Sequence, residues 1–242
     1  MLRRTTVSVL DKMTQRVVAL LGLDLDFSLS VGRDPFNAIT DDFYLGARPD
    51  REQVPALKEA GITHVVSCLG EDVRAKVAFL KEDFQALFIP MHDGMHEDIA
   101  SVFPAFFDFV RTGREQHARA KVFVHCEVGV SRSATLATAL VMQRQRMPFF
   151  EAYCDVRAKR AEVLPNIGFA SQLQRLEFDM HPRAHGDQSV SSLARYLREV
   201  CMVPVELDTL QSALHHHDYD ALRAIQAIFG EEIPRVIQGV RL

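Results

Sequence analysis

The chain has 242 residues, of which 48% are hydrophobic and 25% are charged, and its formal net charge is −4. This composition excludes a disordered chain and supplies enough apolar residues for a folded core. The slight acidic balance argues against a protein that coats nucleic acid or an anionic membrane, although a local pocket could still bind a small anion. Nucleic acid is therefore not an expected partner.

The cysteines are Cys68, Cys126, Cys154 and Cys201, and no two of them form a CxxC pair. Such scattered cysteines do not match a zinc site, and their small number in a chain of this length argues against a disulfide framework. The histidine run 215–217 does not favour a metal site either, because successive helical residues point in different directions. We therefore predict no metal ligands and a reducing compartment, the cytoplasm, and we expect Cys154 and Cys201 to be buried in the core.

Residues 1–35 are predicted to form an N-terminal segment ahead of the main domain. The first 23 residues hold four basic side chains against one acidic side chain, and their apolar positions are spaced for one face of a helix. We expect an amphipathic helix that packs on the domain, and a mitochondrial presequence is the alternative interpretation. No stretch of the sequence is long and apolar enough to cross a bilayer, so no integral membrane segment is predicted.

Residues 36–183 alternate between strand and helix patterns. Short apolar runs predict strands, and the segments between them have helical spacing. The predicted strands cover residues 43–45, 62–68, 86–90 and 121–125. The predicted helices cover residues 55–60, 73–80, 99–114, 132–144 and 168–180, with a further helix opened by Pro148. This alternation predicts an α/β fold with a central, mostly parallel sheet flanked by helices, and such sheets bind ligands at the carboxyl ends of their strands.

Residues 187–242 have a different pattern. They contain no convincing strand and predict three or four short helices, so we expect a helical C-terminal extension. One interpretation is that the extension packs on the α/β domain. The other is that it forms a protein-interaction element, and the sequence leaves both open.

Residues 122–133 carry the most specific chemical signal. A predicted buried strand ends at Cys126 and leads through a tight loop into a helix, whose N-terminal N–H groups are suited to binding phosphate. The same groups would stabilise Cys126 as a nucleophilic thiolate, and Gly129 permits the turn. Arg132 offers a fork of donors that matches two phosphate oxygens, and Ser133 could hydrogen-bond the sulfur. A buried core cysteine is the alternative interpretation of Cys126.

The sequence at residues 125–133, HCEVGVSRS, resembles the HCxxGxxRS signature of the dual-specificity phosphatase family. The resemblance runs from about residue 37 to residue 177. It is also carried by residues 42–46, 61–66, 165–169 and 172–174. It implies a protein tyrosine phosphatase-like fold, hydrolysis of phosphate monoesters through a phosphocysteine intermediate, and no metal or other cofactor.

The resemblance also implies roles for single residues. Cys126 would be the nucleophile and Arg132 the phosphate clamp, and Ser133 would assist departure of the sulfur. His125 would orient the loop and tune the thiol, while Asn166 would hydrogen-bond the loop backbone; simple packing is the alternative for both. The backbone amides expected to hold the phosphate belong to Glu127, Val128, Gly129, Val130, Ser131 and Arg132.

This chemistry needs a general acid that protonates the leaving oxygen. In the family the acid is an aspartate on a loop after the third or fourth strand. Asp93 matches that position best, and Asp98 is the second candidate, whose other role would be to cap the next helix. The sequence has no tryptophan, so the tryptophan-containing acid loop of classical tyrosine phosphatases is absent.

Cys68 ends the predicted strand 62–68 and is a candidate redox partner of Cys126. In some relatives of the resembling family, a cysteine at this place forms a reversible disulfide with the nucleophile after oxidation. The alternative is that Cys68 is a core residue.

The loop residues also bear on the substrate. Phosphoinositide phosphatases of this superfamily tend to place Lys or Arg inside the loop, whereas this chain has Glu127, Val128 and Val130. We therefore expect a phosphoprotein substrate. A faint similarity at residues 33–37 and 45–49 to phosphatidylglycerophosphate phosphatases keeps a phospholipid as the alternative. A pseudophosphatase that only binds phosphoproteins is a third reading, but such proteins typically lose the cysteine or the arginine.

Overall fold

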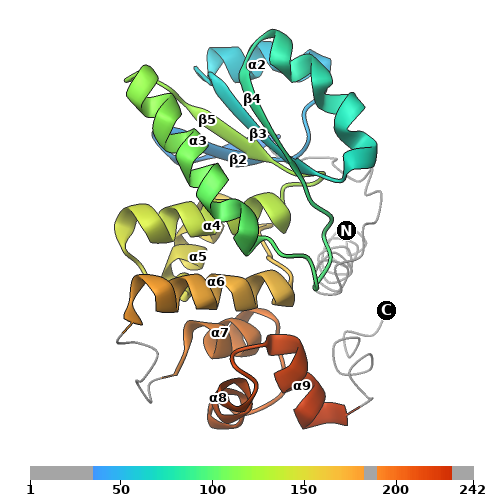
Figure 1. Cartoon of the computed structure of the whole chain (residues 1–242), viewed down its shortest axis with the longest axis vertical. Helices are drawn as coiled ribbons and strands as arrows, with labels where there is room; N and C mark the ends of the chain where they lie inside the picture. Colours follow the sequence, from blue (N-terminus) through green and yellow to red (C-terminus); the bar gives the residue numbers. More distant parts are fainter. Residues whose placement is uncertain (1–34, 183–189, 231–242) are drawn as a thin grey trace, which may run out of the picture.

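The computed structural model of the protein describes residues 35–182 and 190–230 (Figure 1). The predicted N-terminal helix and residues 231–242, the last part of the predicted C-terminal extension, lie outside the described residues. Within the described ranges, no helix combines the length and apolar character that a bilayer crossing requires.

A five-stranded sheet forms the centre of the protein, with the strand order β1-β2-β5-β3-β4 (Figure 1). β2, β5, β3 and β4 run parallel, and β1 pairs antiparallel with β2 at one edge. The predicted mostly parallel sheet is confirmed, but β1 was not predicted because only one of its residues is buried. The strands are β1 (Phe36–Thr40), β2 (Phe43–Gly46), β3 (His64–Leu69), β4 (Gln85–Pro90) and β5 (Val122–His125).

Side chains alternate between the two faces of the sheet and build a core on each. Val65 and Phe123 pack toward α2 (Val54–Glu59) and the 3₁₀ helix η2 (Glu71–Glu82). A short 3₁₀ turn, η1 (Arg51–Gln53), directly precedes α2. Val66 and Val124 pack on the other face, against the larger group of helices. Residues 73–80 were predicted as a helix, and they are helical but wound as 3₁₀.

Four helices of the described residues lie on the second side of the sheet. A short 3₁₀ turn, η3 (Ala100–Val102), precedes them, and Pro104 lies in the first turn of the helix that follows. The helices are α3 (Phe103–Gln116), α4 (Arg132–Gln145), α5 (Phe149–Lys159) and α6 (Ile167–Met180). α4 is buried along most of its length, because it lies between the sheet and the other helices. Its buried threonines, Thr135 and Thr138, donate their hydroxyls to carbonyls one turn earlier.

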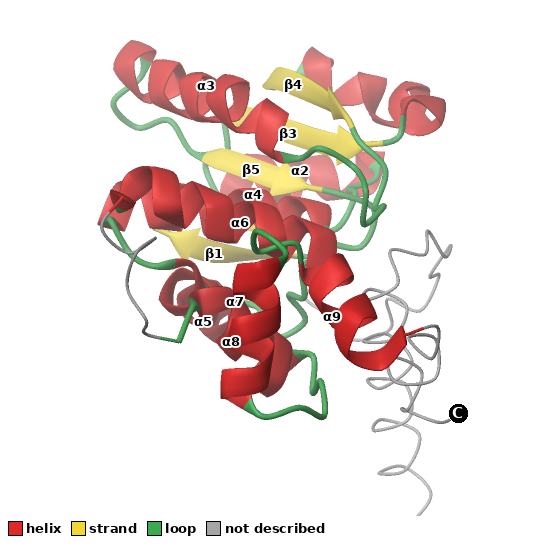
Figure 2. Cartoon of the chain, turned by 60° about the horizontal axis from the view of Figure 1, so that its bottom comes forward, coloured by secondary structure: helices red, strands yellow, loops and turns green. Residues whose placement is uncertain are grey.

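The C-terminal region is helical, as predicted, and packs on α5 and α6 on the side away from the sheet (Figures 1 and 2). It consists of α7 (Ser192–Arg195), the π-helical turn η5 (Tyr196–Val200), α8 (Leu207–His216) and α9 (Ala221–Phe229). Its buried residues, among them Leu193, Leu210 and Ile225, belong to the same apolar core as α4 and α6. The observed packing therefore matches the first of the two interpretations of this region.

Candidate active site

The loop between β5 and α4, residues 126–131, lies at the carboxyl end of the sheet and is here called the phosphate loop. Gly129 has a φ of +73°, and a Cβ atom at this position would lie 2.5 Å from the carbonyl of Gly46. A side chain is therefore excluded both by the left-handed backbone and by the close approach of β2. The turn that the sequence predicted at Gly129 is confirmed.

Cys126 is completely buried at the start of the phosphate loop. Its Sγ accepts a hydrogen bond from the N–H of Gly129 at 3.3 Å and another from the hydroxyl of Ser133 at 3.2 Å. Ser133 lies in the first turn of α4, where the helix dipole is positive. Both donors and the dipole favour a negative charge on the sulfur.

Arg132 is the first residue of α4, and its side chain is 3% exposed. The guanidinium donates from Nη1 to the carbonyl oxygen of Met91 at 3.1 Å. Its Nε lies 3.6 Å from Oδ2 of Asp93. Arg132 thus links the phosphate loop to residues 91–99, which we call the acid loop because it carries both candidate acids.

The structure separates the two candidate acids. Oδ1 of Asp93 accepts from the hydroxyl of Ser131 at 2.6 Å and from Nδ2 of Asn166 at 2.9 Å, so Asp93 lies against the phosphate loop. Asp98 instead accepts from the backbone N–H of Ser101 at 3.2 Å, as a residue that caps a helical turn does. Of the two candidates, Asp93 is therefore the one that lies beside the phosphate loop.

Asn166 does not make its predicted bond to the backbone of the phosphate loop. Its side-chain amide donates to Asp93, and its Oδ1 caps α6 by accepting from the N–H of Phe169 at 2.9 Å. Its own backbone N–H donates to the Ser131 hydroxyl at 3.1 Å. Asn166 therefore contacts the acid and a loop side chain, because the N-terminus of α6 lies beside both.

Arg160 binds the backbone of the phosphate loop through its side chain, and sequence reasoning missed it. It is 2% exposed, and it donates to the carbonyl oxygens of Gly129 at 3.1 Å and Val128 at 3.3 Å. A third donor reaches Oδ1 of Asn37 at 2.7 Å. Because both loop carbonyls turn toward this cation, the neighbouring N–H groups can face the sulfur. In the sequence, Arg160 is one basic residue among several near the end of a helix.

Glu127 is held by Arg48, which was also missed. Arg48 donates to the carboxylate from Nε at 3.0 Å and from Nη2 at 2.9 Å, and its backbone N–H donates to the Glu127 carbonyl at 3.1 Å. This bidentate pair compensates the acidic charge inside the loop. It also ties the loop to the segment after β2.

His125 and Cys68 lie beside Cys126, near the carboxyl ends of the two neighbouring strands β5 and β3. The His125 ring hydrogen-bonds Ser67 Oγ at 2.8 Å and lies 3.3 Å from the Cys126 carbonyl oxygen. Burial lowers the pKa of His125 to about 4, so the ring is neutral near pH 7 and is suited to orienting the loop.

The pairing of Ser67 with His125 places Cys68 next in register to Cys126. Both are buried thiols, and burial raises the pKa of Cys68 well above its usual range. The expectation that Cys154 and Cys201 are buried is wrong: Cys154 is exposed and Cys201 is partly exposed. Cys154 lies on an exposed face of α5, whereas Cys201 directly follows η5 and packs partly against the core.

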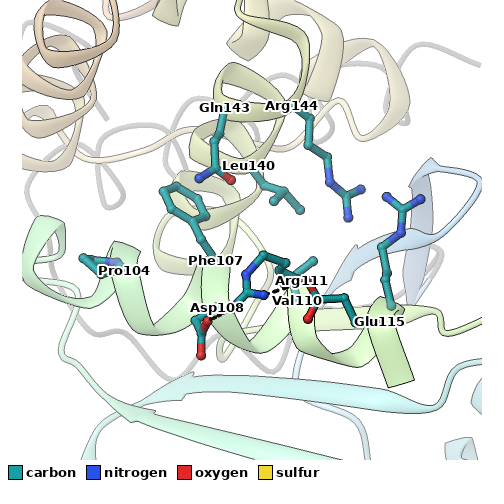
Figure 3. Close-up of a pocket in the computed structure, with 10 residues that line it drawn as sticks. Pro104, Phe107, Asp108, Val110, Arg111, Glu115, Leu140, Gln143 and Arg144 are labelled. Atoms are coloured by element: carbon teal, nitrogen blue, oxygen red, sulfur yellow. Dashed lines mark hydrogen bonds and ion pairs between the residues drawn. The ribbon is translucent and has the colours of Figure 1, made fainter. Parts of the chain in front are cut away.

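A hollow of about 890 Å³ lies between α3 and α4, and no residue of the phosphate loop lines it (Figure 3). Phe107 and Leu140 supply apolar lining, and Arg111 and Arg144 lie around them (Figure 3). Arg111 pairs with acids on its own helix and Arg144 with Asp42, so the arginine charges are already compensated. Since none of its lining residues belongs to the phosphate loop, the hollow is separate from the site around Cys126.

The chain is similar in sequence to known phosphatases. The chain is 35% identical over 143 residues to Protein-tyrosine-phosphatase MKP1 of Arabidopsis thaliana, covering 59% of this chain and 18% of that protein. It is 31% identical over 144 residues to tyrosine-protein phosphatase vhp-1 of Caenorhabditis elegans, covering 60% and 21%. The chain thus spans about a fifth of the length of these two relatives.

The solved structure of the human tyrosine phosphatase-like serine/threonine/tyrosine-interacting protein matches with a TM-score of 0.57 and 28% identity, over 60% of this chain and 97% of that one. Residues 43–179 match the family model of the dual specificity phosphatase catalytic domain. That match takes in the acid loop, the phosphate loop and α6, and it covers more than half of the 242 residues. The chain therefore belongs to the dual-specificity phosphatase family.

Proposed function

We propose that this chain is a phosphatase that hydrolyses phosphotyrosine and phosphoserine or phosphothreonine monoesters on proteins through a phosphocysteine intermediate. One observation carries the proposal. The buried Cys126 sulfur accepts hydrogen bonds from Gly129 and Ser133, while Ser131 of the same loop bonds Asp93. A nucleophile, a phosphate cradle and an acid thus meet at one edge of the sheet.

In the first step the Cys126 thiolate attacks phosphorus, and the bond from phosphorus to the ester oxygen breaks. The loop N–H groups and Arg132 stabilise the charge on the phosphoryl oxygens. Asp93 gives its proton to the departing oxygen. Since Oδ1 of Asp93 accepts two hydrogen bonds, we assign this proton to Oδ2, which faces Arg132.

In the second step water attacks the phosphocysteine. Asp93, now a carboxylate, takes a proton from the water, and the bond from phosphorus to sulfur breaks. The Ser133 hydroxyl, 3.2 Å from Sγ, stabilises the thiolate as it leaves. Phosphate and the starting enzyme are the products.

A protein substrate is supported by the residues of the phosphate loop. Val128 and Val130 bring no positive charge, and Arg48 already pairs with Glu127, so the phosphate loop, all of which the structure describes, itself adds no cation for an inositol phosphate head group. The two sequence relatives named above, from Arabidopsis thaliana and Caenorhabditis elegans, are protein phosphatases by name. Because Cys126 and Arg132 are both present, we favour catalysis over phosphoprotein binding alone.

The test is phosphate release from an aryl phosphate, from a phosphotyrosine and a phosphothreonine peptide, and from phosphatidylglycerophosphate. Wild type, Cys126→Ser and Asp93→Ala are compared. We expect hydrolysis of the aryl phosphate and both peptides by wild type, and a loss of at least about 10⁴-fold in Cys126→Ser. Hydrolysis of the lipid alone would replace the protein substrate with a phospholipid. Peptide binding without turnover would indicate a phosphoprotein-binding protein.

We also propose that Cys68 protects the nucleophile under oxidation. Peroxide would oxidise the Cys126 thiolate to a sulfenic acid and be reduced to water, and the Cys68 sulfur would then displace water to form a disulfide. The register of β3 and β5 supports this pairing, while burial of the Cys68 thiol would slow it. Mass spectrometry of peroxide-treated protein should find the Cys68–Cys126 crosslink. Over-oxidised Cys126 without a crosslink would contradict the proposal.

A further inference from the structure

Helix α6 lies between the acid loop and the C-terminal helices. On its first side, the Gln172 amide donates to the Glu97 carbonyl at 2.8 Å and accepts from the N–H of Ala100 at 2.8 Å. Gly168 lies so close to the acid loop that a Cβ atom there would collide with the carbonyl oxygen of Met95. This side of α6 therefore holds the acid loop at two places by direct contact.

On its second side, α6 is bonded to the C-terminal helices. Gln174 accepts from the N–H of Leu193 at 2.7 Å, and Ser171 accepts from the N–H of Ala221 at 3.0 Å. These bonds satisfy backbone donors in the first turns of α7 and α9. α6 thus contacts the acid loop on one side and the C-terminal helices on the other.

The most direct connection runs through Tyr196. Its hydroxyl donates to the Pro165 carbonyl oxygen at 2.6 Å. The same peptide group, through the Asn166 N–H, donates to Ser131 Oγ at 3.1 Å, and Ser131 donates to Asp93 Oδ1 at 2.6 Å. A continuous series of donors in one direction therefore joins Tyr196 to Asp93, and such a series strengthens each bond in it.

The Tyr196 hydroxyl is a fixed and permanent donor. The side chain is fully buried, and its ring packs edge-on against Tyr153 at 5.0 Å and tilted against Phe149 at 5.3 Å. Burial, with smaller contributions from Cys201 and Tyr153, raises the pKa of the Tyr196 phenol well above its usual value. The hydroxyl therefore stays protonated at any pH at which the protein is assayed.

We propose that Tyr196 is a positioning residue for Asp93, and that the C-terminal helices are a structural part of the acid site. This inference rests on the general acid role proposed for Asp93. Holding Oδ1 from the side of α6 fixes the direction of Oδ2, the oxygen that delivers the proton. The region outside the family match, which ends at residue 179, would thus contribute to the chemistry.

The test compares two esters whose leaving groups need the acid to different degrees. Phenyl phosphate releases a weakly acidic phenol and depends on proton transfer, whereas 4-nitrophenyl phosphate releases a stable anion and depends on it much less. For Tyr196→Phe we expect kcat on phenyl phosphate to fall about tenfold, the rate factor of one buried hydrogen bond. The kcat on 4-nitrophenyl phosphate and both KM values should stay within about twofold of wild type.

Tyr219→Phe is the matched control, because it removes a hydroxyl from the same C-terminal region, in the turn between α8 and α9. That hydroxyl accepts from Gln211 at 3.4 Å and does not bond Pro165. Its ratio of the two kcat values should equal that of wild type. Equal losses on both esters in Tyr196→Phe, or the same change of ratio in Tyr219→Phe, would overturn the positioning role.

Asp93→Asn, assayed on the same pair of esters, separates this inference from the proposed function. If Asp93→Asn behaves like wild type, the general acid assignment fails and the positioning role fails with it. If Asp93→Asn loses rate selectively on phenyl phosphate and Tyr196→Phe does not, only the positioning role fails.

A measurement on the unaltered chain covers the case in which Tyr196→Phe does not fold. The Asn166 N–H donates to Ser131, and the carbonyl of the same peptide group accepts from the Tyr196 hydroxyl. This N–H should exchange with solvent deuterium as slowly as the amides of α6. Exchange at the rate of an open loop would overturn the series of hydrogen bonds.

Discussion

The two loops that meet at the site are held in different ways. The phosphate loop is fixed by Arg160 from inside the core, by Arg48 from the end of β2, and by a bond from the N–H of Leu164 to the Val130 carbonyl at 2.8 Å. Besides its bonds to Arg132 and Ser131, the acid loop is held by α6, and the Asp93 side chain is 13% exposed against 3% for Arg132. The loop proposed to bind the constant phosphate group is thus locked into the core, while the loop proposed to face the variable leaving group also depends on a neighbouring helix.

Replacing Asp93 by alanine should remove the proposed proton donor of the acid loop, while the phosphate loop keeps its bonds to Arg160 and Arg48. We expect kcat on a phosphothreonine peptide to fall by about 10²–10⁴-fold, the usual contribution of a general acid. Steady-state kinetics measure this loss. Asp98→Ala is the control, since it should cost about 1 kcal/mol of stability as a lost cap and leave kcat unchanged. A larger loss of kcat in Asp98→Ala than in Asp93→Ala would reverse the assignment.

Replacing Arg160 by methionine should loosen the phosphate loop. The carbonyls of Val128 and Gly129 would lose a buried charged donor, which we expect to cost about 3 kcal/mol in the free energy of unfolding. Urea denaturation measures the cost, and kcat/KM should fall on every ester alike. Arg157→Met is the control, because Arg157 bonds the Tyr153 hydroxyl and contacts neither loop carbonyl. Equal stability of the two variants would argue against the role of Arg160.

The buried His125 should make the phosphate loop side of the sheet sensitive to acid. Burial lowers its pKa from 6.5 to about 4, so the unfolded chain binds a proton at a higher pH than the folded chain does. The contribution of neutral His125 to the free energy of unfolding is complete above pH 6.5 and is lost as the pH falls from 6.5 toward 4. At pH 5 the loss amounts to about 2 kcal/mol.

Chemical denaturation at pH 7.5 and pH 5 measures this loss. His125→Gln removes the titrating group, so its stability should fall less between the two pH values than that of wild type. An equal fall in both proteins would show that other groups govern the acid sensitivity.

The exposed link between Arg48 and Glu127 should have the smallest effect. Its two side chains are 28% and 23% exposed, so solvent weakens the pair, and we expect Arg48→Met to cost no more than about 1 kcal/mol. Adding 1 M salt to the wild type should remove part of the same energy. A loss comparable to that of Arg160→Met would show that the loop is anchored from the surface as firmly as from the core.

Most strands and helices could be predicted from the sequence because their signals are local. The apolar runs of β3 and β5 and the long apolar stretch of α4 specify buried elements whatever surrounds them. β1 was missed because an edge strand with one buried residue lacks such a run. The 3₁₀ winding of η2 was missed because a helical pattern does not distinguish the two kinds of turn.

The amino-acid sequence by itself determined the segment that brings Cys126, Gly129, Arg132 and Ser133 together, because these residues lie within one strand end, one loop and the first turn of one helix. Only the tertiary structure decided that Arg160 and Arg48 hold the loop, that Asn166 contacts the acid, and that Tyr196 reaches the site. These four residues act on partners that lie between about 30 and 80 positions away in the chain. Their contacts depend on which carbonyl or carboxylate the fold brings within hydrogen-bonding distance, and no periodicity or spacing in the sequence encodes that distance.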